Sequence, residues 1–217
     1  ELGNDGYQDV DYVLTTRELA RMIKQAGLDF ANLPDEQFDN PFGEATGAGV
    51  IFGATGGVME AALRTVAEVL TGKSLPEDNY HIVRGTDGIK RAEVDIEGIK
   101  IKAAVAHGLG NARKLLEAVR AGEESYDFFE IMACPGGCVN GGGQPHVPSK
   151  IKNFIDVREV RAKGLYDLDA ARPLRRSHEN PSIKAIYDEY FGSYGSHKAH
   201  EVLHTTYVAR KVNADHE

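Results

Sequence analysis

The two cysteines of this 217-residue chain, Cys134 and Cys138, lie four residues apart in the glycine-rich segment MACPGGCVNGGGQP, residues 132–145. Thiolates bind metals and take part in redox chemistry, so these sulfurs are the first candidates for chemistry. Their spacing leaves four interpretations open: a pair of inert buried cysteines, half of a zinc site, a disulfide, or a redox or iron–sulfur site. Structural zinc needs four ligands, and a disulfide is disfavoured over so short a loop.

A short helix beginning at Pro135 is expected to position both sulfurs, because proline is tolerated at the first helical position. In this helix the two cysteines would face one side, and the helix amino terminus would favour thiolates over thiols. Gly136 and Gly137 carry no side chains, so a bulky inorganic group could approach the backbone amides. Thiolates surrounded by amide donors are what an iron–sulfur cluster requires.

The elements that must position this segment are strands alternating with helices. This order predicts an α/β fold with a twisted, mainly parallel sheet flanked by helices, plus one antiparallel hairpin that turns at Glu97-Gly98. An apolar helical stripe is formed by Met59, Ala62, Leu63, Val66 and Leu70. The predicted strands lie at 10–14, 80–84, within 92–106 and at 126–132. The predicted helices lie at 15–24 (opened by a capping box), within 51–70, at 111–120 and near 149–163, 181–191 and 197–209. A long loop is expected over 28–50.

Two regions follow from this pattern. Residues 1–145 are expected to form an α/β lobe that ends in the cysteine segment, and residues 146–217 a helical carboxy-terminal tail. The chain starts with Glu1 rather than methionine and reaches a predicted strand almost at once. We therefore expect either a processed start or a piece of a longer protein.

The charge and composition exclude several classes of partner. The formal net charge is −8, which argues against nucleic acid or an anionic membrane as the main partner. No run approaches about 18 apolar residues and no secretory signal opens the chain. Two cysteines do not form a disulfide framework, so a cytoplasmic location fits best.

The complete cysteine segment resembles the last of three signature motifs of the [FeFe]-hydrogenases. The positions that match are Phe128, Glu130, Met132, Ala133, Cys134, Gly137, Cys138, Gly141, Gly142, Gly143 and Pro145. Four further segments resemble the catalytic domain of this family: TTREL at 15–19, GAGVIFGATGGVMEAALRT at 47–65, SHENP at 177–181 and LHTTY at 203–207. The resemblance covers nearly the entire chain and selects the iron–sulfur interpretation.

Two cysteine motifs of the same family are absent. The family binds its active-site cluster with four cysteines, and the first two lie in motifs of the TSC-P and MPC type, neither of which occurs here. The chain therefore resembles the carboxy-terminal half of the hydrogenase catalytic domain. The resemblance implies one lobe of the iron-only hydrogenase large-subunit fold, followed by a small-subunit-like belt. The missing amino-terminal half would be the main partner, and the isolated chain is expected to be inactive.

The resemblance also implies a cofactor, the H-cluster, in which a [4Fe-4S] cubane is bridged to a diiron site with CO, cyanide and an amine-dithiolate. Cys134 would ligate the cubane, and Cys138 would ligate it and bridge to the diiron site. Met132 would pack against the diiron site, and Phe52 would form part of its apolar wall. The implied reaction is reversible H₂ oxidation and proton reduction in an anaerobic setting, with electrons exchanged with ferredoxin or with flavoprotein or NAD(P)-linked subunits.

Other features allow weaker interpretations. The amides of Gly53, Gly56 and Gly57 could face anionic ligands, or these glycines could serve a tight turn and close helix packing. His197, His200 and His204 share one helical face, which could bind a metal but is more typical of a surface or interhelical face. Gly108-Leu109-Gly110 suggests a dinucleotide fingerprint, although Arg113 stands where the third glycine belongs.

A different functional class is the runner-up. Eukaryotic iron–sulfur assembly proteins related to the hydrogenases carry a similar cysteine segment but make no hydrogen. We expect them to lack the tail from SHENP to LHTTY. A third interpretation is a hydrogenase-like sensor that binds the cluster and turns over slowly.

Overall fold

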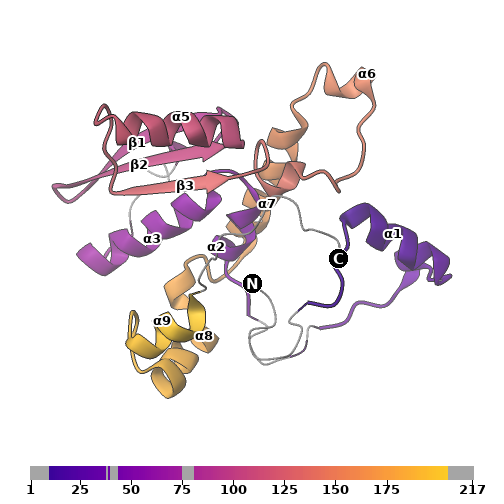
Figure 1. The fold of residues 1–217 in the computed structure, drawn as a ribbon. Coiled ribbons are helices and arrows are strands. Elements are labelled where there is room, and N and C mark those ends of the chain that lie inside the picture. The colour runs from indigo at the N-terminus through magenta and orange to yellow at the C-terminus, as the bar shows by residue number, and fades with distance from the viewer. Residues whose placement is uncertain (1–9, 38, 40–43, 75–80, 205–217) are drawn as a thin grey trace, which may run out of the picture.

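The computed structural model describes residues 10–37, 39, 44–74 and 81–204. Its centre is a three-stranded sheet of β1 (Ile89–Ile96), β2 (Ile99–His107) and β3 (Phe128–Met132), in the order β1-β2-β3 (Figure 1). β1 and β2 are antiparallel, and β2 and β3 are parallel. The hairpin turn lies at Glu97-Gly98, as predicted, where both residues have positive φ angles. The α/β fold is confirmed, with a small mixed sheet.

Helices cover both faces of this sheet. Helix α3 (Gly57–Thr71) lies on one face and α5 (Leu109–Arg120) on the other (Figure 1). Successive side chains of β2 point to opposite faces, so this strand contributes to both core layers. The layer beneath α3 contains Met59, Leu63, Ala67, Val83, Ala92, Val94, Ile96, Ala103 and Val105. The layer beneath α5 contains Ala104, Ala106 and Leu115.

The helical tail packs against the sheet lobe through its longest helix. Helix α7 (Val157–Ala171) contacts α2 (Gly47–Val50) and the 3₁₀ turn η2 (Ile51–Gly53). The remaining elements are α1 (Thr16–Gln25), η1 (Phe30–Asn32), η3 (Cys138–Asn140), α6 (Ser149–Lys152), η4 (Ser177–Glu179), α8 (Pro181–Ile186), the π-helical turn η5 (Tyr187–Phe191) and α9 (His197–Leu203).

A buried ion network fastens α7 to α3. Arg64 donates to both carboxylate oxygens of Asp169, at 2.9 and 2.7 Å, and to Glu60 at 2.6 Å. Arg84 also donates to Glu60, and Arg175 to Asp169. Glu60 and Asp169 are buried, so each carboxylate depends on these arginines to offset the cost of leaving water. The tail is thereby tied to the lobe through buried charges.

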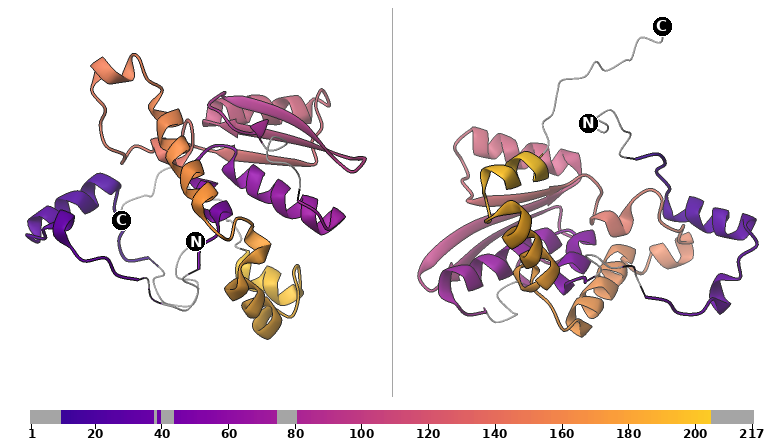
Figure 2. Two further views of the ribbon diagram at one scale, coloured as in Figure 1. Left: turned by 180° about the vertical axis from the view of Figure 1, so that it is seen from behind. Right: turned by 90° about the horizontal axis from the view of Figure 1, so that it is seen from below.

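Helix α1 lies apart from the sheet and its flanking helices (Figures 1 and 2). Its predicted capping box is confirmed, because the Thr15 side chain accepts the Glu18 amide and the Glu18 carboxylate accepts the Thr15 amide. The helix buries none of its residues. It contacts the segment after the cysteines through Arg17, whose guanidinium donates to the Gly142 carbonyl at 2.8 Å and bonds to His146.

Two predicted strands are wrong. Residues 10–14 pair with no strand in the part of the chain that the structure describes, and Tyr12 and Val13 are 88% and 86% exposed. Apolar side chains there resemble a buried strand, but a strand also needs a neighbour for its backbone groups. Residues 81–84 form a turn rather than a strand, and Val83 alone of these reaches the core. Residue 80 lies outside the described residues.

The predicted helices are mostly present with changed limits. The helix within 51–70 begins only at Gly57, and its buried apolar residues are Met59, Ala61, Leu63 and Ala67, while Val66 and Leu70 are exposed. The helix near 149–163 is divided into α6 and α7, because Asp156 caps a new helix start by accepting the Arg158 amide. The last predicted helix, 197–209, is seen as α9, which ends at Leu203 because His204 is extended; residues 205–209 lie outside the described residues.

Candidate metal centre

Strand β3 leads directly into the segment that carries both thiols, residues 133–145, called here the cysteine loop. Cys134 follows the end of β3 by two residues, and Cys138 begins the turn η3. The predicted α-helix from Pro135 is wrong. Gly136 and Gly137 have φ angles of 85° and 96°, which a right-handed helix does not contain. The sulfurs are therefore positioned by a turn of left-handed glycines rather than by a helix face.

Neither thiol is buried in the core or joined in a disulfide. Cys134 is partly buried and Cys138 is exposed, and both are free. The interpretations as inert buried cysteines and as a disulfide are thus contradicted. Among the described residues, no group of three or more His, Cys, Asp or Glu side chains is placed to hold a metal ion. The described residues of the chain therefore offer a pair of thiols, and a complete set of ligands has to include others.

The cysteine loop rests on the loop that precedes α3. The amide of Thr55 donates to the Gly136 carbonyl at 3.1 Å. A Cβ added to Gly137 would lie 2.7 Å from both the Gly53 carbonyl oxygen and the Thr55 nitrogen. Only glycine permits this approach, so the two backbones are in direct contact at the turn between the thiols.

The side chains of Arg161 and Asn140 hold three further carbonyls of the cysteine loop. Arg161 on α7 donates to the Val139 carbonyl at 2.9 Å and to the Pro145 carbonyl at 3.0 Å. The side chain of Asn140 donates to the Pro135 carbonyl at 3.1 Å. Sequence reasoning missed Arg161, because no local pattern indicates which carbonyl a distant helix will reach. The tail therefore fixes the shape of the loop as well as covering the lobe.

The two predicted wall residues lie near this loop. Met132 ends β3 and is partly buried, and its carbonyl accepts the Gly108 amide at 2.8 Å. This amide is consequently not available to a dinucleotide phosphate. Phe52 lies in η2, beside the residue that contacts Gly137, and is 45% exposed. Both positions are compatible with an apolar wall beside the thiols, and their roles stay predictions.

The glycine amides at the start of α3 already have partners. The Glu130 carboxylate accepts the Gly56 amide at 2.7 Å and the Met59 amide at 2.8 Å. A Cβ on Gly57 would overlap the Ile51 carbonyl. For Gly56 and Gly57 the alternative of a tight turn with close helix packing is thus confirmed over an external anion. Sequence reasoning gave Glu130 no role, although a carboxylate at an inward strand position was a visible signal.

A buried lysine, Lys90, lies beneath the loop that precedes α3. The ammonium of Lys90 donates to the carbonyls of Thr55, at 3.0 Å, and Gly85, at 2.9 Å. Burial lowers the pKa of Lys90 to about 8, although the carboxylates of Glu130 and Asp87 act in the opposite direction.

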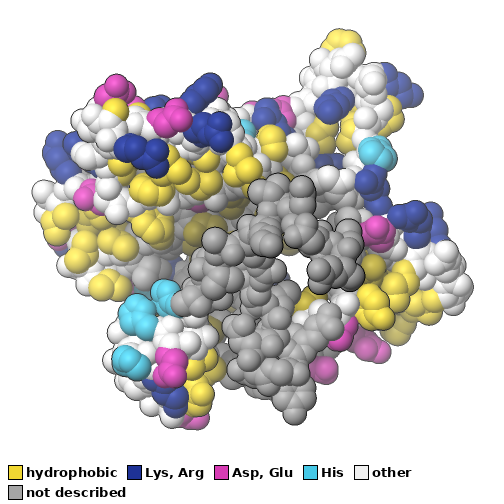
Figure 3. Space-filling view, in the orientation of Figure 1, with side chains coloured by type: hydrophobic (Ala, Val, Ile, Leu, Met, Phe, Trp, Pro, Cys, Tyr) yellow, Lys and Arg dark blue, Asp and Glu magenta, His cyan; other side chains and the backbone are white. Residues whose placement is uncertain are grey.

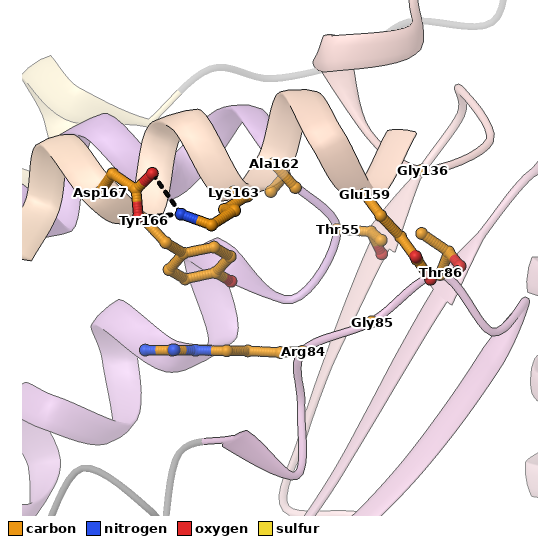
Figure 4. Close-up of a pocket in the computed structure, with 11 residues that line it drawn as sticks. Thr55, Arg84, Gly85, Thr86, Gly136, Glu159, Ala162, Lys163, Tyr166 and Asp167 are labelled. Carbon is orange, nitrogen blue, oxygen red and sulfur yellow. Dashed lines mark hydrogen bonds and ion pairs between the residues drawn. The ribbon is translucent and has the colours of Figure 1, made fainter. Parts of the chain in front are cut away.

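A pocket of about 370 Å³ adjoins the cysteine loop at Gly136 (Figure 4). The Tyr166 ring lies over the Arg84 guanidinium, 4.2 Å from its centre, and Lys163 pairs with Asp167 at the rim. The Thr55 and Tyr166 hydroxyls are buried and have no hydrogen-bond partner among the residues that the structure describes. The lining residues are Ala54, Thr55, Arg84, Gly85, Thr86, Gly136, Glu159, Ala162, Lys163, Tyr166 and Asp167.

The histidine cluster does not form a metal site. His197 has a 97% exposed side chain that lies 4.0 Å from Glu201, and the His200 and His204 rings stack 4.7 Å apart. This matches the expected surface face. His178, in the SHENP segment, lies 3.2 Å from the Thr65 hydroxyl and fastens the tail to α3.

Apolar side chains gather on the surface along the sheet edge and α3 (Figure 3). Strand β3 is an edge strand, and Phe128, Phe129 and Ile131 are each more than a third exposed. An apolar surface of this kind is suited to contact with further protein. No helix among the described residues is long and apolar enough to cross a membrane.

Comparisons with known proteins relate both parts of the chain to hydrogenases. The family described as "Iron only hydrogenase large subunit, C-terminal domain" matches residues 1–142, and "Iron hydrogenase small subunit" matches residues 155–210. The chain is 48% identical to the NADP-reducing hydrogenase subunit HndD of Solidesulfovibrio fructosivorans over 211 residues, which are 97% of this chain and 35% of that protein.

A solved structure of a variant of [FeFe]-hydrogenase HydA1 from Chlamydomonas reinhardtii has the same fold. The TM-score is 0.72 at 44% identity, over 95% of this chain and 57% of that one. The chain thus spans about a third of HndD and somewhat more than half of the HydA1 chain.

An assembly protein is a weaker match. Cytosolic iron-sulfur assembly component 3 of Bos taurus is 29% identical over 206 residues, covering 93% of this chain and 42% of that protein. An alignment of that extent reaches into the tail, so the expectation that this class lacks the tail is wrong. The percentage of identical residues, 48% for HndD and 29% for the Bos taurus protein, separates hydrogenases from assembly proteins, and the presence of the tail does not. The chain belongs to the iron-only hydrogenase family, and it corresponds to the carboxy-terminal domain of the large subunit followed by the small-subunit region.

Proposed function

We propose that this chain supplies Cys134 and Cys138 as two of the four thiolate ligands of an H-cluster in a hydrogenase that catalyses reversible H₂ oxidation and proton reduction. The observation that carries the proposal is the pair of free thiols in one loop whose backbone is fixed on two sides. The high identity to HndD over nearly the whole chain supports the same function.

The residues present fit such a group. A cluster needs thiolates that face outward from a rigid backbone, and here one thiol is exposed and the other partly buried. When bound, the H-cluster supplies the metal centre for heterolytic H₂ chemistry, the amine base and the electron relay. The chain positions both sulfurs, and Met132 and Phe52 supply apolar surface that would exclude water beside them. No described residue of this chain is proposed as a general acid or base.

The other ligands and the electron partners would come from outside these residues. We propose the remaining amino-terminal half of the large subunit as the source of the other two cysteines, because the chain spans 35% of HndD. It would also cover the apolar sheet edge. Ferredoxin, or flavoprotein or NAD(P)-linked subunits, would exchange electrons, and the cytoplasm is the proposed location. The chain alone, with two thiols, is expected to be inactive.

We further propose the division of the chain into an α/β lobe, residues 1–145, and a small-subunit-like belt, residues 146–217. The two family matches support this division, since one ends at residue 142 and the other begins at residue 155.

The test replaces each cysteine by serine in the longest polypeptide that the gene encodes, produced with the hydrogenase maturation machinery. Cys138→Ser should abolish the infrared bands of CO and cyanide, and Cys134→Ser should lower the iron content by disrupting the cubane. The control, Ala133→Ser, introduces a serine one residue before Cys134 and should keep both the CO and cyanide bands and the iron content. Unchanged CO and cyanide bands in Cys138→Ser would contradict the bridging role.

An assembly factor is the second candidate, supported by the match to the Bos taurus protein. Such a protein would bind an ordinary iron–sulfur cluster and show no CO or cyanide bands in any variant. The unsubstituted protein therefore distinguishes the two functions, and a slow hydrogen sensor would show the bands with a low turnover rate.

A further inference from the structure

Two opposite charges are buried in one row across the sheet. Lys90 of β1 pairs with Val105 of β2, and Val105 pairs with Glu130 of β3. Lys90 and Glu130 are each 7% exposed, and Val105 between them is completely buried. All three side chains point to the face beneath α3, beside a cluster of apolar core residues that includes Val105. Burying two charges in such a layer is unfavourable unless both are well bonded.

The two charges hold the same peptide group from opposite ends. The ammonium of Lys90 donates to the carbonyl of Thr55, and the carboxylate of Glu130 accepts the amide of Gly56. This carbonyl and this amide belong to the single peptide unit that joins residues 55 and 56. A peptide dipole placed with its oxygen toward a cation and its N–H toward an anion is fixed in direction.

This peptide unit lies next to the cysteine loop. The amide of Thr55 donates to the Gly136 carbonyl, and the backbone of Gly137 contacts Gly53 and Thr55. The Thr55–Gly56 unit is thus joined through the Thr55 Cα to the backbone that contacts the turn between Cys134 and Cys138. Glu130 adds a second link, since it lies on the strand that leads into the first cysteine.

We propose that Lys90 and Glu130 are positioning residues for the cluster: they fix the Thr55–Gly56 peptide and thereby the geometry of the cysteine loop, and their opposite charges set the electrostatic potential at the bound cluster. Only the electrostatic part, the effect on the bound cluster, rests on the proposed function. Both side chains bond to protein backbone, so we assign them a positioning role rather than a catalytic one. A sheet that needed only packing at these positions would be served by apolar side chains, as it is at Val105.

Opposite charges allow a test that a merely structural role would fail. The variants are Lys90→Met and Glu130→Gln, made in the longest polypeptide that the gene encodes with its cofactor installed. Removing a positive charge makes reduction of the cluster harder, and removing a negative charge makes it easier. The midpoint potential should therefore fall in Lys90→Met and rise in Glu130→Gln. Structural loosening without an electrostatic effect would not give opposite signs.

Two further variants serve as controls. Arg91→Met removes a positive charge from the next residue of β1, where the side chain is half-exposed and pairs with Glu124 on the opposite face. It should leave the potential unchanged. Lys90→Arg keeps the positive charge and should keep the midpoint potential of the unsubstituted protein. The proposal would be overturned if the midpoint potential shifted in the same direction in Lys90→Met and Glu130→Gln. It would also be overturned if Arg91→Met shifted the potential as much as Lys90→Met does.

The geometric part is tested without the cofactor. In the apoprotein, amide hydrogen exchange over residues 52–57 and 133–139 should become at least tenfold faster in Lys90→Met and Glu130→Gln, while the β1–β2 hairpin stays protected. Uniform loss of protection, or no change in these two segments, would refute it. Since this measurement needs no cluster, it separates a failure of the inference from a failure of the proposed function, which the CO and cyanide bands of the unsubstituted protein report.

Discussion

Adding one methyl group at Gly137 should disturb the turn that lies between the two thiols. The φ of 96° and ψ of −169° at Gly137 lie in a region that is essentially restricted to glycine, and a side chain there costs about 1–3 kcal/mol. The added Cβ would also lie 2.7 Å from two backbone atoms, which cannot rotate away as a side chain can. Overpacking of this kind costs about 1–3 kcal/mol more. Gly137→Ala should therefore destabilise the protein by roughly 2–6 kcal/mol.

The assay compares Gly137→Ala with Gly142→Ala, which lies in the same loop, has no positive φ and would place its Cβ in open space. For a chain of this size each kcal/mol lowers the melting temperature by about 2–4 °C, so Gly137→Ala should melt roughly 4–24 °C lower. It should also bind less iron, because the turn between the thiols is displaced. If Gly137→Ala and Gly142→Ala melt at the same temperature and bind equal iron, the contact between the cysteine loop and the loop that precedes α3 does not hold the thiols in place.

Two further predictions concern buried charges. Asp169→Asn should lower the free energy of unfolding by about 3–5 kcal/mol in urea titrations, because it removes the buried carboxylate that Arg64 and Arg175 share. Asp167→Asn, two residues earlier and exposed beside Lys163, should change it by less than about 1 kcal/mol, and equal effects would contradict the buried network. Between pH 8 and 10.5 the unfolded state binds the proton that folded Lys90 has lost, so stability should rise with pH by up to about 3 kcal/mol, and Lys90→Met should remove that rise.

The parts of the fold that sequence could predict are those fixed by neighbouring residues. The capping box at Thr15, the left-handed hairpin turn at Glu97-Gly98 and the strand before Cys134 all depend on a few adjacent side chains, and all are present. The helix at Pro135 was predicted by the same logic and failed. Two consecutive glycines released the backbone into left-handed angles that a spacing argument between cysteines does not consider.

The support of the site depends on register and therefore could not be predicted. Lys90 and Glu130 were recognisable only as charges within apolar strands, and their partnership depends on both strands pairing with the same residue of β2. Likewise, the reach of Arg161 to the cysteine loop follows from how α7 packs on α2. Motif reading located the thiols, and long-range packing explains what holds them in place.

The most direct test of the central claim is anomalous diffraction at the iron absorption edge from crystals of the cofactor-loaded polypeptide. We expect iron bonded to the sulfurs of both Cys134 and Cys138, with Cys138 shared between the cubane and the diiron site and the other cysteine ligands supplied from outside these 217 residues. Iron bound elsewhere, with either sulfur free of metal, would contradict it.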